Sequence, residues 1–219
     1  MGNQLRSVAF VTVAHHPADP ELALAAVHGE ALLTHTVRGL LGTPEIDLVA
    51  VAAPERCAQL FSEVLPRTER CEVIAADSLR AAFAIVEPRL SAHSAVLVHD
   101  ALRAFTPRRT FRAVLNAIGH GAEVVVPVLP MSDTVKTVDA AGAVTATVDR
   151  DELRSAHTPI GFTFPAFRST LAGSADPGLA TAAGATTIPG DPDAMRVASA
   201  FELALAEALV AGGDREDPL

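Results

Sequence analysis

The sequence predicts a single α/β domain over residues 1–219, with a mostly parallel β-sheet flanked by helices. Three observations predict it. Apolar, β-branched runs typical of buried parallel strands alternate along the chain with segments of helical periodicity. The chain has 219 residues and a hydrophobic content of 49%, which is enough for one large core. No internal repeat and no long linker divides it, so one domain is expected.

The first half of the chain contains a strand–helix–strand unit. Residues 7–14 (SVAFVTVA) form an apolar run that predicts a buried strand. Residues 30–41 carry leucine and valine at helical spacing, and residues 47–53 (DLVAVAA) predict a second buried strand. The alternation then continues with helices near 55–65 and at 77–87, a strand at 94–99, a helix at 107–119 and a strand at 122–128.

A projecting arm is predicted next. Residues 134–149 hold two short β-branched runs around Asp139-Ala-Ala-Gly142, a hairpin pattern with glycine at the turn. Because projecting antiparallel strands expose their edges, we expect a second subunit to cover this arm, which spans about residues 134–158. The last predicted helix, 199–211, begins at Ser199 with Glu202 three residues later, which is a capping box.

Composition excludes several classes of partner. The net charge of −9 repels a phosphate backbone, and the chain has no Trp or Tyr on which bases could stack, so no nucleic-acid partner is expected. No apolar stretch is long enough to span a membrane, and the sequence predicts a cytoplasmic protein. Cys57 and Cys71 lack the spacing of a zinc or redox motif, so we expect buried free thiols.

The segment from His99 to Arg103 carries the strongest signal for chemistry. A buried strand there delivers Asp100 and then Arg103 at its carboxyl end, the edge where ligands of open α/β sheets bind. An aspartate at this place can hold a divalent cation, and an arginine can bind a phosphate with two hydrogen bonds. From these residues alone, a capped strand end with a surface ion pair explains the pattern equally well.

Two segments extend this signal into a family resemblance. VLVHDALRAF (96–105) and PVLPMSDTVKTVDAAGAVTATVDRDELRSAHTPIGF (127–162) resemble the central signatures of the 2-C-methyl-D-erythritol 4-phosphate cytidylyltransferases. The similarity runs from about residue 94 to 168 and is weaker at both ends. It implies a Rossmann-like nucleotidyltransferase fold that dimerises through its β-arm. It also implies transfer of CMP from CTP to methylerythritol phosphate with Mg²⁺, a step of non-mevalonate isoprenoid biosynthesis that releases pyrophosphate.

The resemblance also implies roles for five residues on the substrate side. Asp100 and Arg103 are expected to face the substrate and the metal. Thr134 and Thr158 are expected to bind the sugar phosphate. Arg150, on the arm, is expected to reach the active site of the neighbouring subunit.

Three further residues are implied on the nucleotide and metal side. Ser78 stands where the family has a serine or threonine near the nucleotide. Asp193 stands at a family aspartate and is expected to share the metal with Asp100. Arg196 takes the place of a family lysine near CTP, which keeps the charge but changes its shape.

The sequence departs from the family after its first strand. The family has a glycine-rich segment with an arginine and a lysine there, whose backbone N–H groups and cations hold the triphosphate. Residues 12–23 of this chain contain no Gly, Arg or Lys, but they include two prolines, Asp19 and Glu21, whose carboxylates repel phosphate. His15 and His16 are read either as replacement contacts to phosphate or metal, or as histidines of an exposed loop.

Three functional hypotheses follow. The chain is a divergent cytidylyltransferase of impaired activity, or a catalytically inactive homologue that binds or regulates, or an enzyme for another nucleotide or sugar phosphate. Retention of the substrate-side residues favours the first, and loss of the phosphate loop favours the second. His99 is expected to orient Asp100, with an ordinary buried, hydrogen-bonded histidine as the alternative.

Overall fold

A computed structural model describes residues 4–13, 19–173 and 184–213 of the chain. Its centre is an eight-stranded sheet in the order β10-β7-β11-β6-β1-β4-β5, with β12 also paired to β7. The strands are β1 (Leu5–Thr12), β4 (Leu48–Ala53), β5 (Cys71–Ala75), β6 (Leu90–Asp100), β7 (Val124–Pro130), β10 (Arg154–Ala156), β11 (Ile160–Thr163) and β12 (Thr186–Pro189).

The sheet has the parallel core that the sequence predicts. β1 pairs in parallel with β4 and β6, and β4 pairs in parallel with β5. β11 lies between β6 and β7 and is antiparallel to both, which makes the sheet mixed. The strands β5, β11 and β12 were not predicted, because each has only four or five residues and β5 and β12 are poorly buried.

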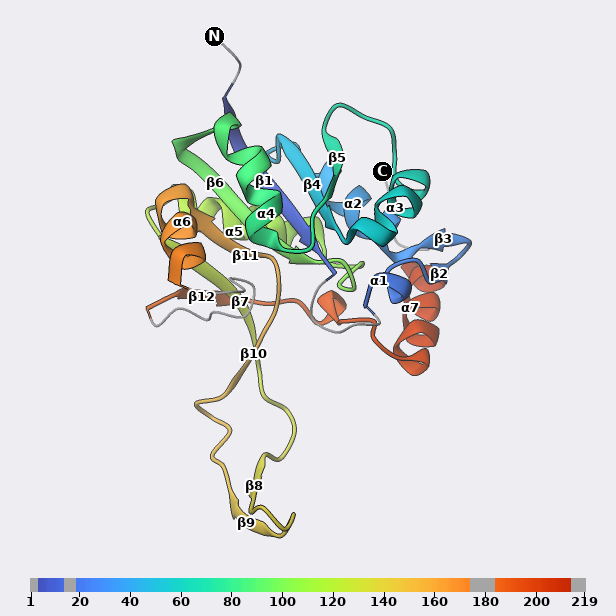
Figure 1. Cartoon of the computed structure of the whole chain (residues 1–219). Helices are drawn as coiled ribbons and strands as arrows, with labels where there is room; N and C mark the ends of the chain where they lie inside the picture. Colours follow the sequence, from blue (N-terminus) through green and yellow to red (C-terminus); the bar gives the residue numbers. More distant parts are fainter. Residues whose placement is uncertain (1–3, 14–18, 174–183, 214–219) are drawn as a thin grey trace.

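Helices cover both faces of the sheet, as Figure 1 shows. Side chains of a strand alternate between its faces, so Ala9 and Val11 of β1 belong to one core cluster while Val8 and Phe10 belong to the other. The first cluster is closed by α2 (Leu32–Leu41), α3 (Ala58–Val64) and α5 (Arg108–Gly119), and the second by α4 (Leu79–Val86) and α6 (Phe164–Gly173).

Gly161 allows β11 to lie directly under α5. A Cβ atom at this position would sit 2.2 Å from Cγ1 of Val114 and 2.8 Å from Cδ1 of Ile118. Glycine in the middle of a strand often marks such a close approach of another element. The close packing of β11 against α5 bears on the candidate site, because β11 directly follows Thr158 and Pro159 in the chain.

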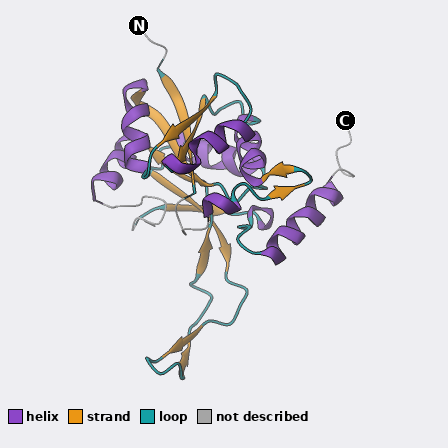
Figure 2. Ribbon diagram, turned by 45° about the vertical axis from the view of Figure 1, so that its right-hand side comes forward, coloured by secondary structure: helices purple, strands orange, loops and turns teal. Residues whose placement is uncertain are grey.

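The last described element is α7 (Ala200–Gly213), which lies at the side of the domain in Figure 2. One half of its predicted capping box is present, because Oγ of Ser199 accepts the N–H of Glu202 (3.2 Å). The Glu202 carboxylate accepts the N–H of Ala198 (2.8 Å), one residue before the expected N–H of Ser199. α7 contacts β2 (Ala26–Val27), which pairs with β3 (Glu30–Ala31) after the short α1 (Asp19–Leu22). Among the described helices, none combines the length and apolarity needed to cross a membrane.

The predicted hairpin forms the tip of an arm that projects from the domain in Figure 1. β8 (Lys136–Val138) pairs antiparallel with β9 (Val144–Thr147), and Gly142 in the connecting turn has a φ of 84°. Every residue of both strands is exposed. Val138 and Val144 lie opposite each other in register and are 59% and 64% exposed, so the arm presents an uncovered apolar pair.

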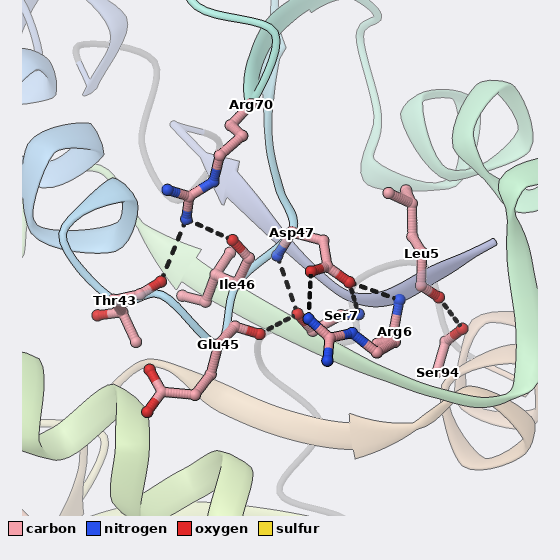
Figure 3. A network of polar contacts seen from close by, with 9 residues as sticks. All are labelled: Leu5, Arg6, Ser7, Thr43, Glu45, Ile46, Asp47, Arg70 and Ser94. Atoms are coloured by element: carbon pink, nitrogen blue, oxygen red, sulfur yellow. Dashed lines mark hydrogen bonds and ion pairs between the residues drawn. The ribbon is translucent and has the colours of Figure 1, made fainter. Parts of the chain in front are cut away.

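A polar network lies at the amino edge of the sheet (Figure 3). Asp100 stands at the opposite edge, as the last residue of β6. The Asp47 carboxylate accepts the backbone N–H groups of Arg6 and Ser7, at 2.7 and 3.3 Å. Burial acts to raise the pKa of Asp47, but the hydrogen bonds from Arg6 and Ser7 outweigh it and lower this pKa. Arg70 donates to the carbonyls of Leu41 (3.1 Å), Thr43 (3.2 Å) and Ile46 (2.5 Å), which fixes the loop after α2.

Both cysteines are free thiols, as predicted. Cys57 is buried and Cys71 is half-buried at the start of β5. Burial, with a smaller contribution from the charge of Glu72, raises the pKa of Cys71 to about 11, so the thiol stays protonated at neutral pH.

Candidate active site

The candidate site lies where β6 ends at Asp100. The Asp100 side chain is only 3% exposed, and its two carboxylate oxygens have different partners. Oδ1 accepts the backbone N–H of Leu102 at 2.9 Å, which fixes the turn after the strand. Oδ2 accepts Nε–H of Arg196 at 2.7 Å, which ties the strand end to the segment before α7. The alternative of a capped strand end with an ion pair is present in part: the carboxylate caps the turn and pairs with Arg196, but it is buried and not at the surface.

Thr158 connects Asp100 to His99. The backbone N–H of Asp100 donates to Oγ1 of Thr158 (3.1 Å), and this oxygen lies 2.9 Å from Nδ1 of His99. Since Oγ1 accepts from Asp100, its own proton can be donated to Nδ1. The His99 ring lies edge-on to Phe111, with centroids 5.1 Å apart. His99 is therefore a buried, hydrogen-bonded histidine whose contact with Asp100 runs through Thr158.

Burial of His99 predicts a loss of stability in acid. Burial lowers the pKa of His99 to about 4, against an opposing effect of the Asp100 charge, whereas the unfolded chain titrates near the ordinary value of 6.5. The neutral ring thus contributes stability that is complete above pH 6.5 and is lost as the pH falls towards 4. We expect His99→Asn, which keeps an acceptor for Thr158, to reduce the fall in unfolding free energy between pH 7 and 4.5 by about 1–2 kcal/mol.

Urea unfolding at the two pH values measures this difference. His93→Asn serves as the control for the same substitution at an exposed histidine of the same strand. An identical pH dependence for His99→Asn and the unmodified protein would contradict the assignment of His99 as a neutral buried ring.

Arg103 links β6 to the same carboxyl-terminal segment. Its Nη1 donates to the carbonyl of Ala194 at 2.6 Å, and the Val197 N–H donates to the carbonyl of Leu102 at 2.8 Å. Among the described residues, no acceptor takes the remaining N–H groups of the Arg103 guanidinium. Burial lowers the pKa of Arg103, with an opposing effect of Asp100, but a guanidinium keeps its charge at neutral pH. The site therefore holds a cation with hydrogen-bond donors to spare.

Asp191 is a member of this cluster that the sequence analysis missed. It accepts Nε–H of Arg109 at 2.7 Å and caps the turn Pro192–Ala194 by accepting the N–H of Asp193. Asp193, the predicted metal residue, is exposed, and its Oδ2 lies 4.0 Å from Nη2 of Arg109. The sequence GDPD contains two aspartates, of which Asp191 is buried and Asp193 is exposed. The sequence pattern does not show this difference.

Other predicted residues lie outside this cluster. Ser78 follows β5, beyond β1 and β4 from β6, and its Oγ caps α4 by accepting the N–H of Ala81 (3.2 Å). Thr134 and Arg150 lie on the exposed arm, where Arg150 donates to the carbonyl of Ser132. The roles implied for these three residues stay predictions.

The divergent loop is described only in part. His15 and His16 lie outside the described residues. Glu21, in α1, forms an ion pair with Arg56, which follows β4 (3.4 Å). Both side chains are more than 60% exposed, so the pair is weak, but it offsets one of the negative charges near this edge.

The described residues alone do not form a complete magnesium site. They contain no group of three or more His, Cys, Asp or Glu side chains placed to hold a metal ion. Nucleotide enzymes hold Mg²⁺ through one or two carboxylates plus the phosphates of the substrate, and Asp100 fits the part of such a carboxylate. Its Oδ2 is engaged by Arg196, so a metal ion and Arg196 would compete for this oxygen.

Comparison with known sequences identifies clear relatives. The sequence profile of the 2-C-methyl-D-erythritol 4-phosphate cytidylyltransferase family matches residues 17–212. A protein of this name from Saccharopolyspora erythraea is 41% identical over 202 residues, covering 86% of this chain and 90% of the relative. Another, from Rhodococcus jostii, is 37% identical over 203 residues, covering 87% of both chains.

Solved structures share the fold. A 4-diphosphocytidyl-2C-methyl-D-erythritol synthase superposes with a TM-score of 0.79 at 20% identity, covering 94% of this chain and all of the other. The 2-C-methyl-D-erythritol 4-phosphate cytidylyltransferase of Thermus thermophilus gives a TM-score of 0.71 at 24% identity, covering 95% and 99% of the two chains. The expected nucleotidyltransferase fold is thereby confirmed.

Proposed function

This chain belongs to the 2-C-methyl-D-erythritol 4-phosphate cytidylyltransferase family, and from that premise we propose that it transfers CMP from CTP to 2-C-methyl-D-erythritol 4-phosphate. In this reaction a phosphate oxygen of the sugar phosphate attacks the α-phosphorus of CTP. The bond from that phosphorus to the bridging oxygen of the β-phosphate breaks, and pyrophosphate leaves. The reaction is a step in isoprenoid biosynthesis.

The observation that carries the proposal is the guanidinium of Arg103. It is positioned by the Ala194 carbonyl and keeps N–H donors that no described residue accepts. The hydroxyl of Thr158 accepts the backbone N–H of Asp100 at the same carboxyl edge of the sheet, where ligands of such folds bind. A positioned cation with spare donors suits a substrate phosphate, because phosphoryl and nucleotidyl transfer depend on positioning and on charge stabilisation.

Asp100 and Arg196 have complementary parts in this proposal. Asp100 orients Arg196 through the 2.7 Å hydrogen bond, and Arg196 then offers its charge to the phosphates of CTP. Mg²⁺, when bound through Asp100 and the CTP phosphates, supplies further charge neutralisation. Asp193 is proposed as a second carboxylate near that ion and Ser78 as a contact to the nucleotide, both from the family resemblance.

The arm supports a proposed homodimer. Val138 and Val144 are exposed on opposite strands, and an uncovered apolar pair on a projecting hairpin suits a contact with a second copy of the chain. In such a dimer Arg150 and Thr134 approach the substrate of the neighbouring subunit.

Arg150→Ala tests the role of the arm. We expect it to weaken the binding of methylerythritol phosphate by roughly 10-fold, because one charge-assisted hydrogen bond to phosphate is lost. The midpoint of thermal unfolding is expected to stay unchanged, since Arg150 is exposed. Calorimetric titration measures the affinity, and Arg154→Ala, an exposed arginine whose bonds are to nearby backbone carbonyls, is the control. Unchanged affinity in Arg150→Ala would rule out the proposed role.

One observation favours a second candidate, a homologue that binds sugar phosphate without transferring CMP. Residues 12–23 contain no Gly, Arg or Lys, and the loss of one preorganised donor to a transition state costs on the order of 10²–10³ in rate. Transfer of a different nucleotide or sugar phosphate meets the same difficulty with the triphosphate.

Steady-state turnover separates the candidates. Purified protein is supplied with CTP, methylerythritol phosphate and Mg²⁺, and pyrophosphate release is followed together with the ³¹P spectrum of the product. Release that requires both substrates supports the enzyme. Binding of methylerythritol phosphate in a calorimeter without release supports the binding protein, and the absence of both contradicts the two proposals.

A further inference from the structure

His157, a residue with no role so far, lies next to the candidate substrate site. It directly precedes Thr158 in the chain. Its backbone N–H donates to the carbonyl of Pro127 in β7 at 2.8 Å. The carbonyl of Val128, the next residue of β7, accepts the N–H of Gly190 at 2.8 Å, and Asp191 follows Gly190. β7 therefore brings His157 and Asp191 to the same part of the carboxyl edge. The charges of Arg103 and Asp191 both act on the imidazole.

The two ring nitrogens of His157 differ in their surroundings. His157 is 8% exposed, and Nδ1 is sealed inside the protein without a hydrogen-bond partner. Nε2 also forms no hydrogen bond with the described residues, but it is not sealed. A buried N–H without a partner is rarer in proteins than a carbonyl or ring acceptor with a spare lone pair, so the proton belongs on Nε2. Nε2, the ring nitrogen that is not sealed, then carries the N–H donor.

A histidine in this position needs a partner that the described chain does not supply. Buried polar groups in proteins are nearly always hydrogen-bonded. Among the described residues, Nδ1 of His157 shares the lack of a partner with Nε2 of His99, but only the His157 ring also has a second nitrogen that is neither sealed nor hydrogen-bonded. Burial, reinforced by the charge of Arg103 and opposed by Asp191, lowers the pKa of His157 to about 4, so the ring is neutral at pH 7. A neutral N–H donor on which the charge of Arg103 also acts suits an anionic oxygen.

We propose that His157 is a further substrate-binding residue, whose Nε2–H donates to a phosphate oxygen of the sugar phosphate beside Arg103 and Thr158. The inference rests on the proposed function, because it takes the sugar phosphate as the ligand of this edge. His157 adds a donor that sets the orientation of the phosphate, while Arg103 supplies the charge.

Calorimetric titration of methylerythritol phosphate into the unmodified protein and three variants tests the proposal. His157→Phe keeps a ring but removes the donor, and its affinity is expected to fall on the order of 10-fold. His157→Gln places an amide N–H near the position of Nε2 and is expected to stay within about threefold of the unmodified protein. His120→Phe, at an exposed histidine that follows α5, is the matched control and is expected to bind normally.

A second readout separates binding from a packing effect. A phosphate dianion on Nε2 favours the protonated ring against Arg103, while the phosphate itself releases protons on binding near pH 5.5, because its second pKa is about 6. Titrations in buffers of different ionisation enthalpy measure the net proton exchange, and the unmodified protein is expected to take up more protons, or release fewer, than His157→Phe and His157→Gln. CTP affinity is expected to be equal in all four proteins.

The outcomes are distinct. Normal affinity and normal proton exchange in His157→Phe would overturn the inference and leave the proposed function standing. Equal weakening in His157→Phe and His157→Gln, with no change in proton exchange, would assign His157 a packing role and also overturn it. If the unmodified protein does not bind methylerythritol phosphate, the proposed function fails first and the inference fails with it.

Discussion

Asp100→Asn is expected to lower the rate of CMP transfer by at least about 10²-fold and the free energy of unfolding by about 3 kcal/mol. The substitution keeps the shape of the side chain but removes the charge that faces Arg196. Removing one partner of a buried ion pair is costly because the other charge stays buried without compensation. We place the stability loss at the lower end of the usual range, since the Arg196 side chain retains 27% exposure.

A double-mutant cycle separates the two effects. Arg196→Met removes the guanidinium, and the combination of Arg196→Met with Asp100→Asn leaves no uncompensated charge between the two positions. The double variant is therefore expected to be more stable than the sum of the two single losses, by at least about 1 kcal/mol, while transfer stays low in all three variants. Additive stability losses in urea unfolding would show that the pair does not couple. A near-normal rate in Asp100→Asn would remove Asp100 from the site.

Arg70→Met is expected to produce the largest loss of stability away from the site, about 2–4 kcal/mol. Its guanidinium donates to three carbonyls in the stretch from Leu41 to Ile46, and methionine leaves these acceptors without their donors. A charged hydrogen bond contributes about 1.5–3 kcal/mol, but the three share one side chain and do not add fully.

The matched control lies in the same network, in Figure 3. Arg6→Met removes an exposed guanidinium that pairs with Asp47 at 3.2 Å, and we expect it to cost less than about 1 kcal/mol. The Arg6 backbone N–H bond to Asp47 remains in this variant. Urea unfolding compares the two proteins. Equal stability losses would mean that Arg70 acts through surface charge alone and that the loop after α2 does not depend on it.

The sequence was informative where apolar runs met charged residues. β6 and Asp100 were predicted because the apolar run of a strand ends in an acid, with a base shortly after it. β11 was missed because it has only four residues, and its Gly161 interrupts the apolar pattern for a reason that lies on another element, α5. The capping box at Ser199 was predicted since its two partners are three residues apart.

The residues that sequence reasoning missed depend on distant partners. Arg70 bonds carbonyls 24 to 29 positions away, and backbone carbonyls leave no mark in a sequence. Asp191 and Arg109 are 82 positions apart, and β12 brings them together only after it pairs with β7. His157 looks like an ordinary polar residue beside Thr158. Its signal is structural: Nδ1 is buried without a partner, a feature that it shares with Nε2 of His99 among the described residues.

A single-turnover experiment tests whether this chain transfers CMP from CTP to methylerythritol phosphate. The protein is held in excess over CTP labelled at the α-phosphate, methylerythritol phosphate and Mg²⁺ are added, and the label is followed over hours. Because enzyme is in excess, even transfer slowed by the altered loop is detected. If the chain transfers CMP, the label moves from CTP into a product that also contains the sugar phosphate, and Asp100→Asn slows this transfer at least about 10²-fold. Label that stays in CTP while methylerythritol phosphate binds would contradict CMP transfer as the function of this chain.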